Sequence, residues 1–437
     1  MKKALDKLAY LLAGHKHTGI AVSILSVLLS VICASVLLLV LGKNPILAFQ
    51  SFLQGSGFLP KSSYGSTSGM LSDLFTFMNT LAPMILAALS FIIANEAGLF
   101  NIGISGQMVA SGFFAIWLVG YSDLPAYLAK PLVILIGLVV GGLLGAIVGW
   151  LKYKFNINEV VSTIMINYIV NYTTGFAINS YFVDTISRAM KTCSSAARLT
   201  LTKVQIMGQS CNVPLGMILA LVAVFVIKFI MDKTVFGLEL KAVGMNGKAA
   251  RYTGIKVGNR LIMSMVISGM LAGLAGVCYY CGYTNTIVPK TLPDMGYDAI
   301  AVALLGNSTP VGSVFAGILI CIFQVGANYM SSSLGVVKEI ASLITGILLL
   351  FSACGGFFKY LAAARLRKIA DEEAEAAKAA ALEAAGTAPE TEAAAPAAAA
   401  PEAAAPEAAA PEAAAPTPEA APQPPVSAEG KEAGKDA

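Results

Sequence analysis

Three clusters of polar residues interrupt otherwise apolar stretches of this sequence, and chemistry is most expected there. Polar side chains inside apolar segments are costly, so they are candidates for function by default. The densest cluster reads Asn95-Glu96-Ala-Gly98-Leu-Phe-Asn101-Ile-Gly103-Ile-Ser105-Gly106-Gln107. Its amides and hydroxyls donate and accept hydrogen bonds, which is the chemistry of polar-solute recognition.

The glycines of this cluster indicate a broken or tightly turned helix. Lipid permits such backbone only where it faces protein or a water-filled cavity. Two interpretations are therefore open: part of a solute pathway or its gate, or a structural turn whose amides satisfy the backbone. Glu96 fits equally well at the inner membrane surface.

The second cluster lies along one expected helix. Its members are Asn158, Glu159, Ser162, Thr163, Asn167 and Asn171. Residues 159, 163, 167 and 171 are four apart and so share one helical face. Such a stripe lines a pore or forms a hydrogen-bonded seam between helices.

The third cluster runs from Tyr297-Asp298 to Gly312 and includes Gly306-Asn307-Ser308-Thr309-Pro310. Here too a short helix is expected to end and another to begin. Two interrupted segments in corresponding halves, 73–180 and 261–354, indicate the substrate region of a repeat-built transporter. The residues predicted to form a polar path are Glu96, Asn101, Gln107, Asn167 and Asn307.

Several catalytic chemistries lack their motifs. No G-x-x-x-x-G-K-[ST] phosphate loop is present, because Ala242 stands where Gly247-Lys248 would need the upstream glycine. There is no H-E-x-x-H motif, and the two histidines are His15 and His17. We therefore expect no catalytic residue, metal site or cofactor in this chain, and its energy must come from a partner or an ion gradient.

The composition indicates a protein covered by lipid. Hydrophobic residues make up 57% of the chain and charged residues only 12%, about half the charge of a typical soluble domain. The Lys and Arg residues lie in short segments between apolar runs, which is the pattern that sets membrane orientation. We therefore interpret them as topology signals and expect no nucleic-acid partner.

Apolar length and flanking charge predict an all-α membrane protein with about ten transmembrane helices, some broken or re-entrant, and a disordered C-terminal tail. The expected helices are 19–41, 73–94, 104–121, 131–151, 158–180, 213–231, 261–283, 298–308, 311–330 and 336–354. The first is too long for a signal peptide, so we expect it to remain uncleaved. The transmembrane domain is predicted to cover 1–356.

The basic residues predict that both termini are cytoplasmic. Segment 1–18, segment 232–260 and the region after the last helix all carry several Lys or Arg residues. The long loop 181–212 is then outside the cell. It holds Cys193 and Cys211, for which a disulfide and two free thiols are both open.

The tail, 357–437, is rich in Ala, Pro and Glu, with near-repeats such as Pro401-Glu402-Ala-Ala-Ala. Residues 357–385 continue a helix in one interpretation, and the rest is expected to be a disordered cytoplasmic tether. Within the membrane domain, glycines at 141, 145 and 149, and at 269 and 273, recur every four residues. This spacing favours close packing of two helices in lipid.

The inside loop 232–260 contains a run of helix formers from Gly247 to Tyr252. Its composition alone favours a solvated connector over a docking helix. However, the string Lys241-Ala242-Val243-Gly244-x-Asn246-x-x-Ala249-Ala250-x-x-x-Gly254-Ile255 resembles the coupling-loop signature of bacterial ABC importer permeases of the ribose and branched-chain amino acid type. The string from Asn95 to Met108 resembles the simple-sugar and nucleoside subgroup of that family.

The resemblance covers about residues 18–356 and implies a set of partners. These are a cytoplasmic ABC ATPase that holds ATP and Mg²⁺, a second permease subunit in a heterodimer, and an extracellular substrate-binding lipoprotein, all at a bacterial plasma membrane. It also implies that the loop docks on the ATPase. The loop residues so assigned are Glu239, Lys241, Gly244, Asn246, Ala249, Ala250 and Gly254.

The resemblance implies import of a nucleoside or simple sugar. A mostly uncharged polar lining agrees with this, because it suits a neutral, hydroxyl-rich solute. Two alternatives stay open. An ion-gradient-driven transporter would use Glu96 and Glu159 as coupling carboxylates. A membrane scaffold would depend instead on residues 371–437.

Overall fold

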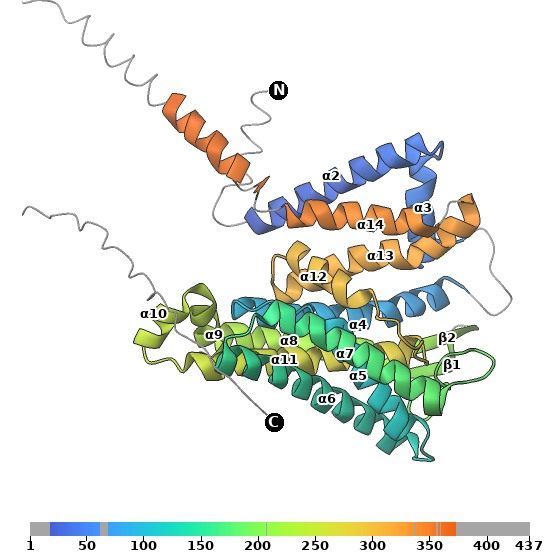
Figure 1. The fold of residues 1–437 in the computed structure, drawn as a ribbon. Coiled ribbons are helices and arrows are strands. Elements are labelled where there is room, and N and C mark those ends of the chain that lie inside the picture. Colours follow the sequence, from blue (N-terminus) through green and yellow to red (C-terminus); the bar gives the residue numbers. More distant parts are fainter. Residues whose placement is uncertain are drawn as a thin grey trace, which may run out of the picture. The chain divides into compact units, whose positions relative to one another are not determined.

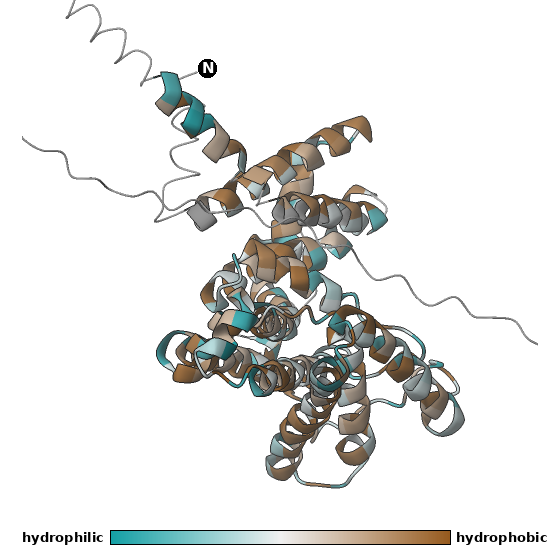
Figure 2. Ribbon diagram, turned by 60° about the vertical axis from the view of Figure 1, so that its left-hand side comes forward, coloured by the Kyte–Doolittle hydropathy of each residue, from teal (hydrophilic) through white to brown (hydrophobic). Residues whose placement is uncertain are grey.

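The computed structural model describes residues 18–61, 69–206, 208–335, 338–354, 357–358 and 360–372. Among them, six helices are long and apolar enough to cross a membrane. Shorter apolar helices lie beside these six, and brown apolar residues dominate the helices in Figure 2. The expected all-α membrane fold is confirmed. The predicted tail beyond residue 372 lies outside the described residues.

The helices and strands follow one another in the order shown in Figure 1. They are α2 (Thr18–Val40), α3 (Pro45–Gly55), α4 (Met70–Glu96), α5 (Ile104–Ala115), η1 (Ile116–Gly120), α6 (Ala126–Phe155), α7 (Glu159–Ala177), η2 (Ile178–Phe182), β1 (Thr200–Ile206), β2 (Gln209–Pro214), α8 (Leu215–Lys233), α9 (Val235–Met245), α10 (Gly247–Tyr252), α11 (Val257–Cys278), η3 (Tyr279–Tyr283), α12 (Met295–Leu305), α13 (Pro310–Leu334) and α14 (Lys338–Ala353). Residues 360–372 are also helical.

Helix α3, helix α9 and the hairpin of β1 and β2 were not predicted. Helix α3 is an 11-residue helix that starts at Pro45, and the Asn44 side chain caps it by accepting a hydrogen bond from the Ile46 amide. Strands β1 and β2 pair antiparallel inside the segment expected to be an outer loop. Figure 1 places this hairpin at the opposite end of the helices from α9 and α10. The 181–212 and 232–260 segments therefore lie at opposite ends, as the predicted topology requires.

Helix α4 is the centre of the packing. Every residue from Phe91 to Ala94 is fully buried, and the buried stretch extends back to Asn79. A helix that is buried all round must be covered by other helices. Helices α8, α11, α12 and α13 pack against it. Helix α4 is therefore an inner helix of the bundle.

The glycine spacing corresponds to a close helix contact, as expected. A Cβ added to Gly141 in α6 would collide with the carbonyl oxygen of Gly269 in α11, and one added to Gly145 would collide with that of Met265. Backbones therefore touch backbones along this interface. Neither helix can yield locally without shifting its partner.

Replacing Gly141 with alanine is expected to lower the thermal stability of the purified protein. Overpacking of this kind costs about 1–3 kcal/mol. Gly317→Ala in α13 is the matched control, because its added Cβ meets only side-chain atoms at 3.4 Å or more. Melting temperatures in mild detergent test the difference, and equal values for the two variants would contradict the tight contact.

The structure decides between the two alternatives for Cys193 and Cys211, which were a disulfide and two free thiols. All seven are free thiols, and Cys193 and Cys211 are both buried without pairing. Cys193 instead contacts the thiol of Cys281 in η3, and its amide donates to the carbonyl of Asn285. The Cys193 segment packs on η3, whereas Cys211 belongs to the hairpin, so the alternative of a Cys193–Cys211 disulfide is corrected.

Candidate functional site

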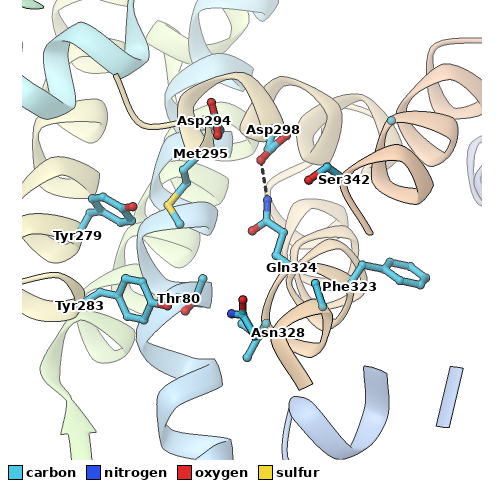
Figure 3. A pocket seen from close by; sticks show the side chains of 13 residues that line it. Thr80, Tyr279, Tyr283, Asp294, Met295, Asp298, Phe323, Gln324, Asn328 and Ser342 are labelled. Carbon is cyan, nitrogen blue, oxygen red and sulfur yellow. Dashed lines mark hydrogen bonds between the residues drawn. The ribbon is translucent and has the colours of Figure 1, made fainter. Parts of the chain in front are cut away.

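A cavity of about 440 Å³ lies between α4, η3, α12, α13 and α14. This volume is within the range of small-molecule sites. Figure 3 shows side chains of several types converging on it. Its polar lining includes Thr80, Tyr279, Tyr283, Asp294, Asp298, Gln324, Asn328 and Ser342. Two of these residues, Asp294 and Asp298, are carboxylates, whereas the solute path predicted from the sequence includes one, Glu96.

The two walls of the cavity differ in chemistry. Tyr279 and Tyr283 lie on one side, with ring centroids 5.8 Å apart and planes at 41°. A π-turn places them, since the Thr284 amide bonds the carbonyl of Tyr279 five residues earlier. Across from them, the Gln324 Nε2 donates to the Asp298 Oδ2 at 2.5 Å. The cavity thus offers aromatic surface opposite hydrogen-bonding groups.

Only Asp298 of these residues belongs to a polar cluster found in the sequence. Gln324 and Asn328 are four residues apart in the apolar run of α13. The rule that polar residues within membrane segments are candidates for function could have found them. The tyrosines gave no such signal, because aromatic residues are ordinary at helix ends in membranes.

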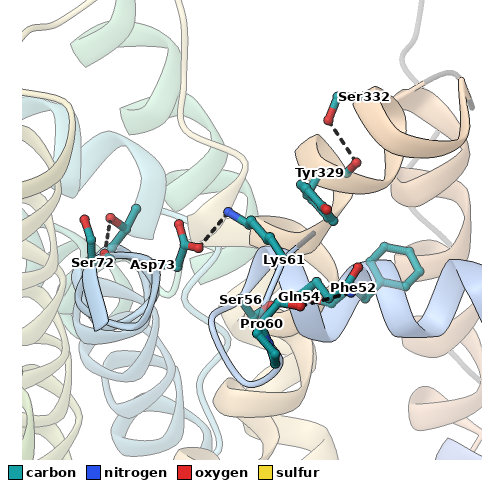
Figure 4. A network of polar contacts seen from close by, with 10 residues as sticks. Phe52, Gln54, Ser56, Pro60, Lys61, Ser72, Asp73, Tyr329 and Ser332 are labelled. Carbon is teal, nitrogen blue, oxygen red and sulfur yellow. Dashed lines mark hydrogen bonds and ion pairs between the residues drawn. The ribbon is translucent and has the colours of Figure 1, made fainter. Parts of the chain in front are cut away.

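A polar clamp ties together two of the helices that line the cavity (Figure 4). The Lys61 Nζ lies 2.7 Å from the Asp73 Oδ2 and 5.0 Å from the ring centroid of Tyr329. Asp73 is two helical turns before Thr80 in α4, and Tyr329 adjoins Asn328 in α13. The clamp therefore fixes the spacing of these helices beside the cavity.

Three of the five predicted path residues come together, but not in the cavity. Asn101 and Gln107 are fully buried, and Asn167 is almost so. The Asn101 Nδ2 donates to the Gln107 Oε1 at 3.1 Å and to the Ser268 Oγ at 2.9 Å. The Ser268 hydroxyl in turn donates to the carbonyl of Ser90. This network joins the turn after α4 to α5 and α11.

Asn167 fastens the same turn to α7. Its Oδ1 accepts from the Gly106 amide at 2.8 Å, and its Nδ2 donates to the Ile102 carbonyl at 3.0 Å. Gly106 lies in the first turn of α5, where backbone amides lack helical partners. The geometry corresponds to the interpretation of a structural turn and an interhelical seam. The path role of these three residues stays a prediction.

Glu96 and Asn307 lie elsewhere. Glu96 is half-buried at the C-terminal end of α4, and Asn307 is exposed in the left-handed turn between α12 and α13. The two interrupted segments do meet, since the Asn95 Nδ2 donates to the Ser308 Oγ at 3.3 Å. Neither Glu96 nor Asn307 lines the cavity.

The segment resembling a coupling loop folds as two short helices, α9 and α10. Asn246 lies between them, and its Oδ1 accepts from the amides of Lys248 and Ala249 at 3.0 and 3.1 Å. Ala250 is buried, and Gly254 takes a left-handed conformation after α10. These residues shape the segment. The expected helical run from Gly247 to Tyr252 is confirmed.

Charged pairs hold the segment to the helices around it. Glu239 pairs with Arg260 at the start of α11, and Arg260 lies 5.3 Å from the ring of Phe236. Lys241 lies 3.5 Å from Asp232, near the end of α8. The pairs leave one side of the segment uncovered.

The segment carries several large apolar residues that are exposed. Met245 is 83% exposed and Tyr252 is 94% exposed. Val235 and Leu238 are exposed as well. Exposed apolar residues of this kind are suited to contact with a protein partner. The segment exposes polar residues as well, among them Asn246, Lys248 and Arg251, so docking on a partner stays a prediction for it.

The two sequence motifs touch each other. A Cβ added to Gly98 would lie 3.3 Å from the Gly244 Cα, and one added to Gly244 would collide with the carbonyl oxygen of Glu96. Gly98 has a φ of +73°, which favours glycine. The α9 backbone thus rests directly on the end of α4, whose Thr80 lines the cavity.

A bundle of membrane-spanning helices with a polar cavity is the architecture of a membrane permease, and α9 and α10 at one end expose apolar residues suited to a protein contact. Comparison with known proteins agrees: the family described as "Branched-chain amino acid transport system / permease component" matches residues 74–353. The chain belongs to this family. Its members are permease components and not enzymes, and they work with an ATPase and a binding protein.

Three relatives are informative. The nucleoside ABC transporter permease protein NupB of Lactococcus lactis is 34% identical, over 78% of this chain and 92% of NupB. The guanosine ABC transporter permease protein NupP of Bacillus subtilis is 36% identical, over 68% and 87%. The nucleoside ABC transporter permease protein NupC, from the same Lactococcus strain as NupB, is 22% identical, over 60% and 83%.

Proposed function

We propose that this chain is the membrane subunit of an ATP-driven importer that carries a nucleoside into the cell. The observation that carries the proposal is the backbone contact between Gly244 and the end of α4. It connects a partner-ready surface to a helix that lines a cavity of suitable size. The names of NupB and NupP support a nucleoside over a simple sugar as the solute.

In this proposal α9 and α10 dock on a cytoplasmic ABC ATPase, which holds ATP and Mg²⁺. Movement of the ATPase shifts α9, and the contact at Gly98 passes the shift to α4. Because α4 carries Thr80, the shift alters one wall of the cavity. Both termini then lie in the cytoplasm, and the hairpin of β1 and β2 faces outward at the plasma membrane of a bacterium.

The proposed complex also holds a second, different permease and an external substrate-binding lipoprotein. Two distinct permease proteins named for nucleosides, NupB and NupC, occur in one Lactococcus strain. This supports a heterodimer for the present chain. The lipoprotein would deliver the solute to the outer mouth of the complex.

The positions of two carboxylates argue against the gradient-driven alternative. Glu159 is 2.8 Å from the Lys152 Nζ, and Glu96 ends α4. Neither lines the cavity, so the two carboxylates that the gradient-driven alternative names are not placed to couple an ion to the solute, and the carboxylates that do line it are Asp294 and Asp298. The ATP-driven proposal needs no carboxylate at those positions.

Replacing Tyr252 with aspartate is expected to remove the ATPase from the complex. A buried, unpaired charge at an apolar interface is strongly unfavourable. The test is a pull-down of the tagged chain from mild detergent, with mass spectrometry of the copurified proteins and an assay of nucleoside uptake. Ile186→Asp is the matched control, because Ile186 is 92% exposed in the outer segment.

We expect the wild type and the control to retain the ATPase and take up nucleoside, and Tyr252→Asp to do neither. If the wild-type chain purifies alone under conditions that preserve known importer complexes, the docking proposal fails. If the complex forms but moves no nucleoside, the solute is wrong.

A further inference from the structure

The cavity has two chemically distinct ends, which Figure 3 shows. Tyr283, Thr80 and Asn328 lie together at one end, where hydroxyl and amide groups both donate and accept hydrogen bonds. Asp298, Asp294 and Met295 lie at the other end. That end combines carboxylates, which only accept when ionised, with an apolar side chain.

Asp298 is oriented toward the cavity by one contact. The Gln324 Nε2 donates to its Oδ2 at 2.5 Å, which fixes the carboxylate plane while leaving further acceptor positions. None of the described residues that line the cavity is Lys, Arg or His. The carboxylate therefore lacks a cationic partner in the lining, and a bound solute must bring N–H or O–H donors to it.

A nucleoside has two parts that match these ends. Its flat base is largely apolar on its faces and suits contact with Met295 and Tyr279, which both line the cavity. Its ribose hydroxyls suit Thr80, Tyr283 and Asn328. With the ribose at the hydroxyl end, the edge of the base points toward Asp298.

Resting on the proposed import of a nucleoside, we propose that Asp298, held by Gln324, makes the cavity selective for bases that present two adjacent N–H donors. The Watson–Crick edge of guanine does so with N1–H and N2–H₂, and a carboxylate accepts both. Adenine offers a donor at N6 beside an acceptor at N1, so the acceptor faces a carboxylate oxygen and is disfavoured.

This chemistry makes Asp298→Asn a specificity switch. The variant side chain has nearly the same shape, with one acceptor and one donor. Its amide oxygen accepts from adenine N6 while its Nδ2 donates to adenine N1, so it complements the Watson–Crick edge of adenine and no longer that of guanine. The loss of a bidentate pair is expected to change the ratio of guanosine to adenosine uptake by about 10- to 100-fold.

The test measures uptake of guanosine, adenosine and uridine by cells that carry the complete importer. The binding protein is the same in every strain. Its own preference therefore cancels when the ratio of guanosine to adenosine uptake in each variant is divided by the same ratio in the wild type. Asp184→Asn, the same chemical change in the exposed outer segment, is the control. Gln324→Leu is a second variant. It is expected to lower the ratio of guanosine to adenosine uptake, as Asp298→Asn does, but by a smaller factor.

We expect Asp298→Asn to lose guanosine uptake selectively, with adenosine uptake maintained or raised and the control unchanged. An equal loss for all three nucleosides would overturn the proposal, because the carboxylate would then act on the shared ribose or on folding. Unchanged ratios in both variants would overturn it too. If the wild type takes up no nucleoside, the proposed function itself fails. Uptake by the wild type thus tests the proposed function, and the ratios in the variants test the role of Asp298.

Discussion

Replacing Gly244 with leucine is expected to reduce ATP-driven uptake by about 10- to 100-fold while the complex still assembles. The leucine Cβ would collide with the Glu96 carbonyl oxygen and lie 3.0 Å from the Gly98 amide nitrogen. Overpacking costs about 1–3 kcal/mol, and each 1.4 kcal/mol shifts an equilibrium tenfold. Helix α9 is therefore expected to shift away from the end of α4, which would break the proposed link between the ATPase and the cavity.

Uptake and ATP hydrolysis must be measured together in this variant. An uncoupled importer hydrolyses ATP without moving solute, whereas an unfolded one does neither. Gly247→Ala is a suitable control within the same segment, because its added Cβ meets only the Val257 side chain at 3.8 Å. Normal uptake by Gly244→Leu would show that force reaches the cavity by another route.

Replacing Asn167 with leucine is expected to destabilise the fold by about 2–6 kcal/mol. The change removes the partners of the buried Gly106 amide and of the partly buried Ile102 carbonyl. Each buried polar group left unpaired costs about 1–3 kcal/mol. Because Asn167 is only 2% exposed, water cannot readily replace it.

Thermal melting in detergent, compared with Asn171→Leu, separates the two interpretations of this polar stripe. The Asn171 side chain is also buried and makes no hydrogen bond within the described part of the chain. If Asn167 serves a seam, its variant melts well below the Asn171 variant. If it serves only a solute path, both melt alike and the Asn167 variant loses uptake instead.

The helical plan could be predicted from the sequence because lipid imposes a simple rule on it. A spanning helix needs about 20 apolar residues, and cytoplasmic segments favour Lys and Arg. Helices α4, α6, α8, α11 and α13 therefore occur close to their expected positions. Helix α3 and the hairpin were missed, because short elements depend on local capping and pairing, which leave weak signals.

The motifs were located in the sequence, but their contacts were not. Asn101 and Asn167 were identified by polarity at helical spacing, which cannot distinguish a pore from a seam. Both kinds of site place amides on one helical face. Their burial and their hydrogen bonds to the turn after α4 settled what they contact in this conformation.

That this chain spans a membrane, where its long apolar helices lie and which family it resembles could all be inferred from its residues alone. These properties follow from hydrophobic length, charge placement and short strings of residues, all of which are local along the chain. Only the tertiary structure brought Gly98 against Gly244 and set Tyr279 across from Asp298 and Gln324. Such contacts join residues far apart in sequence, and they depend on how whole helices pack, which no local pattern encodes.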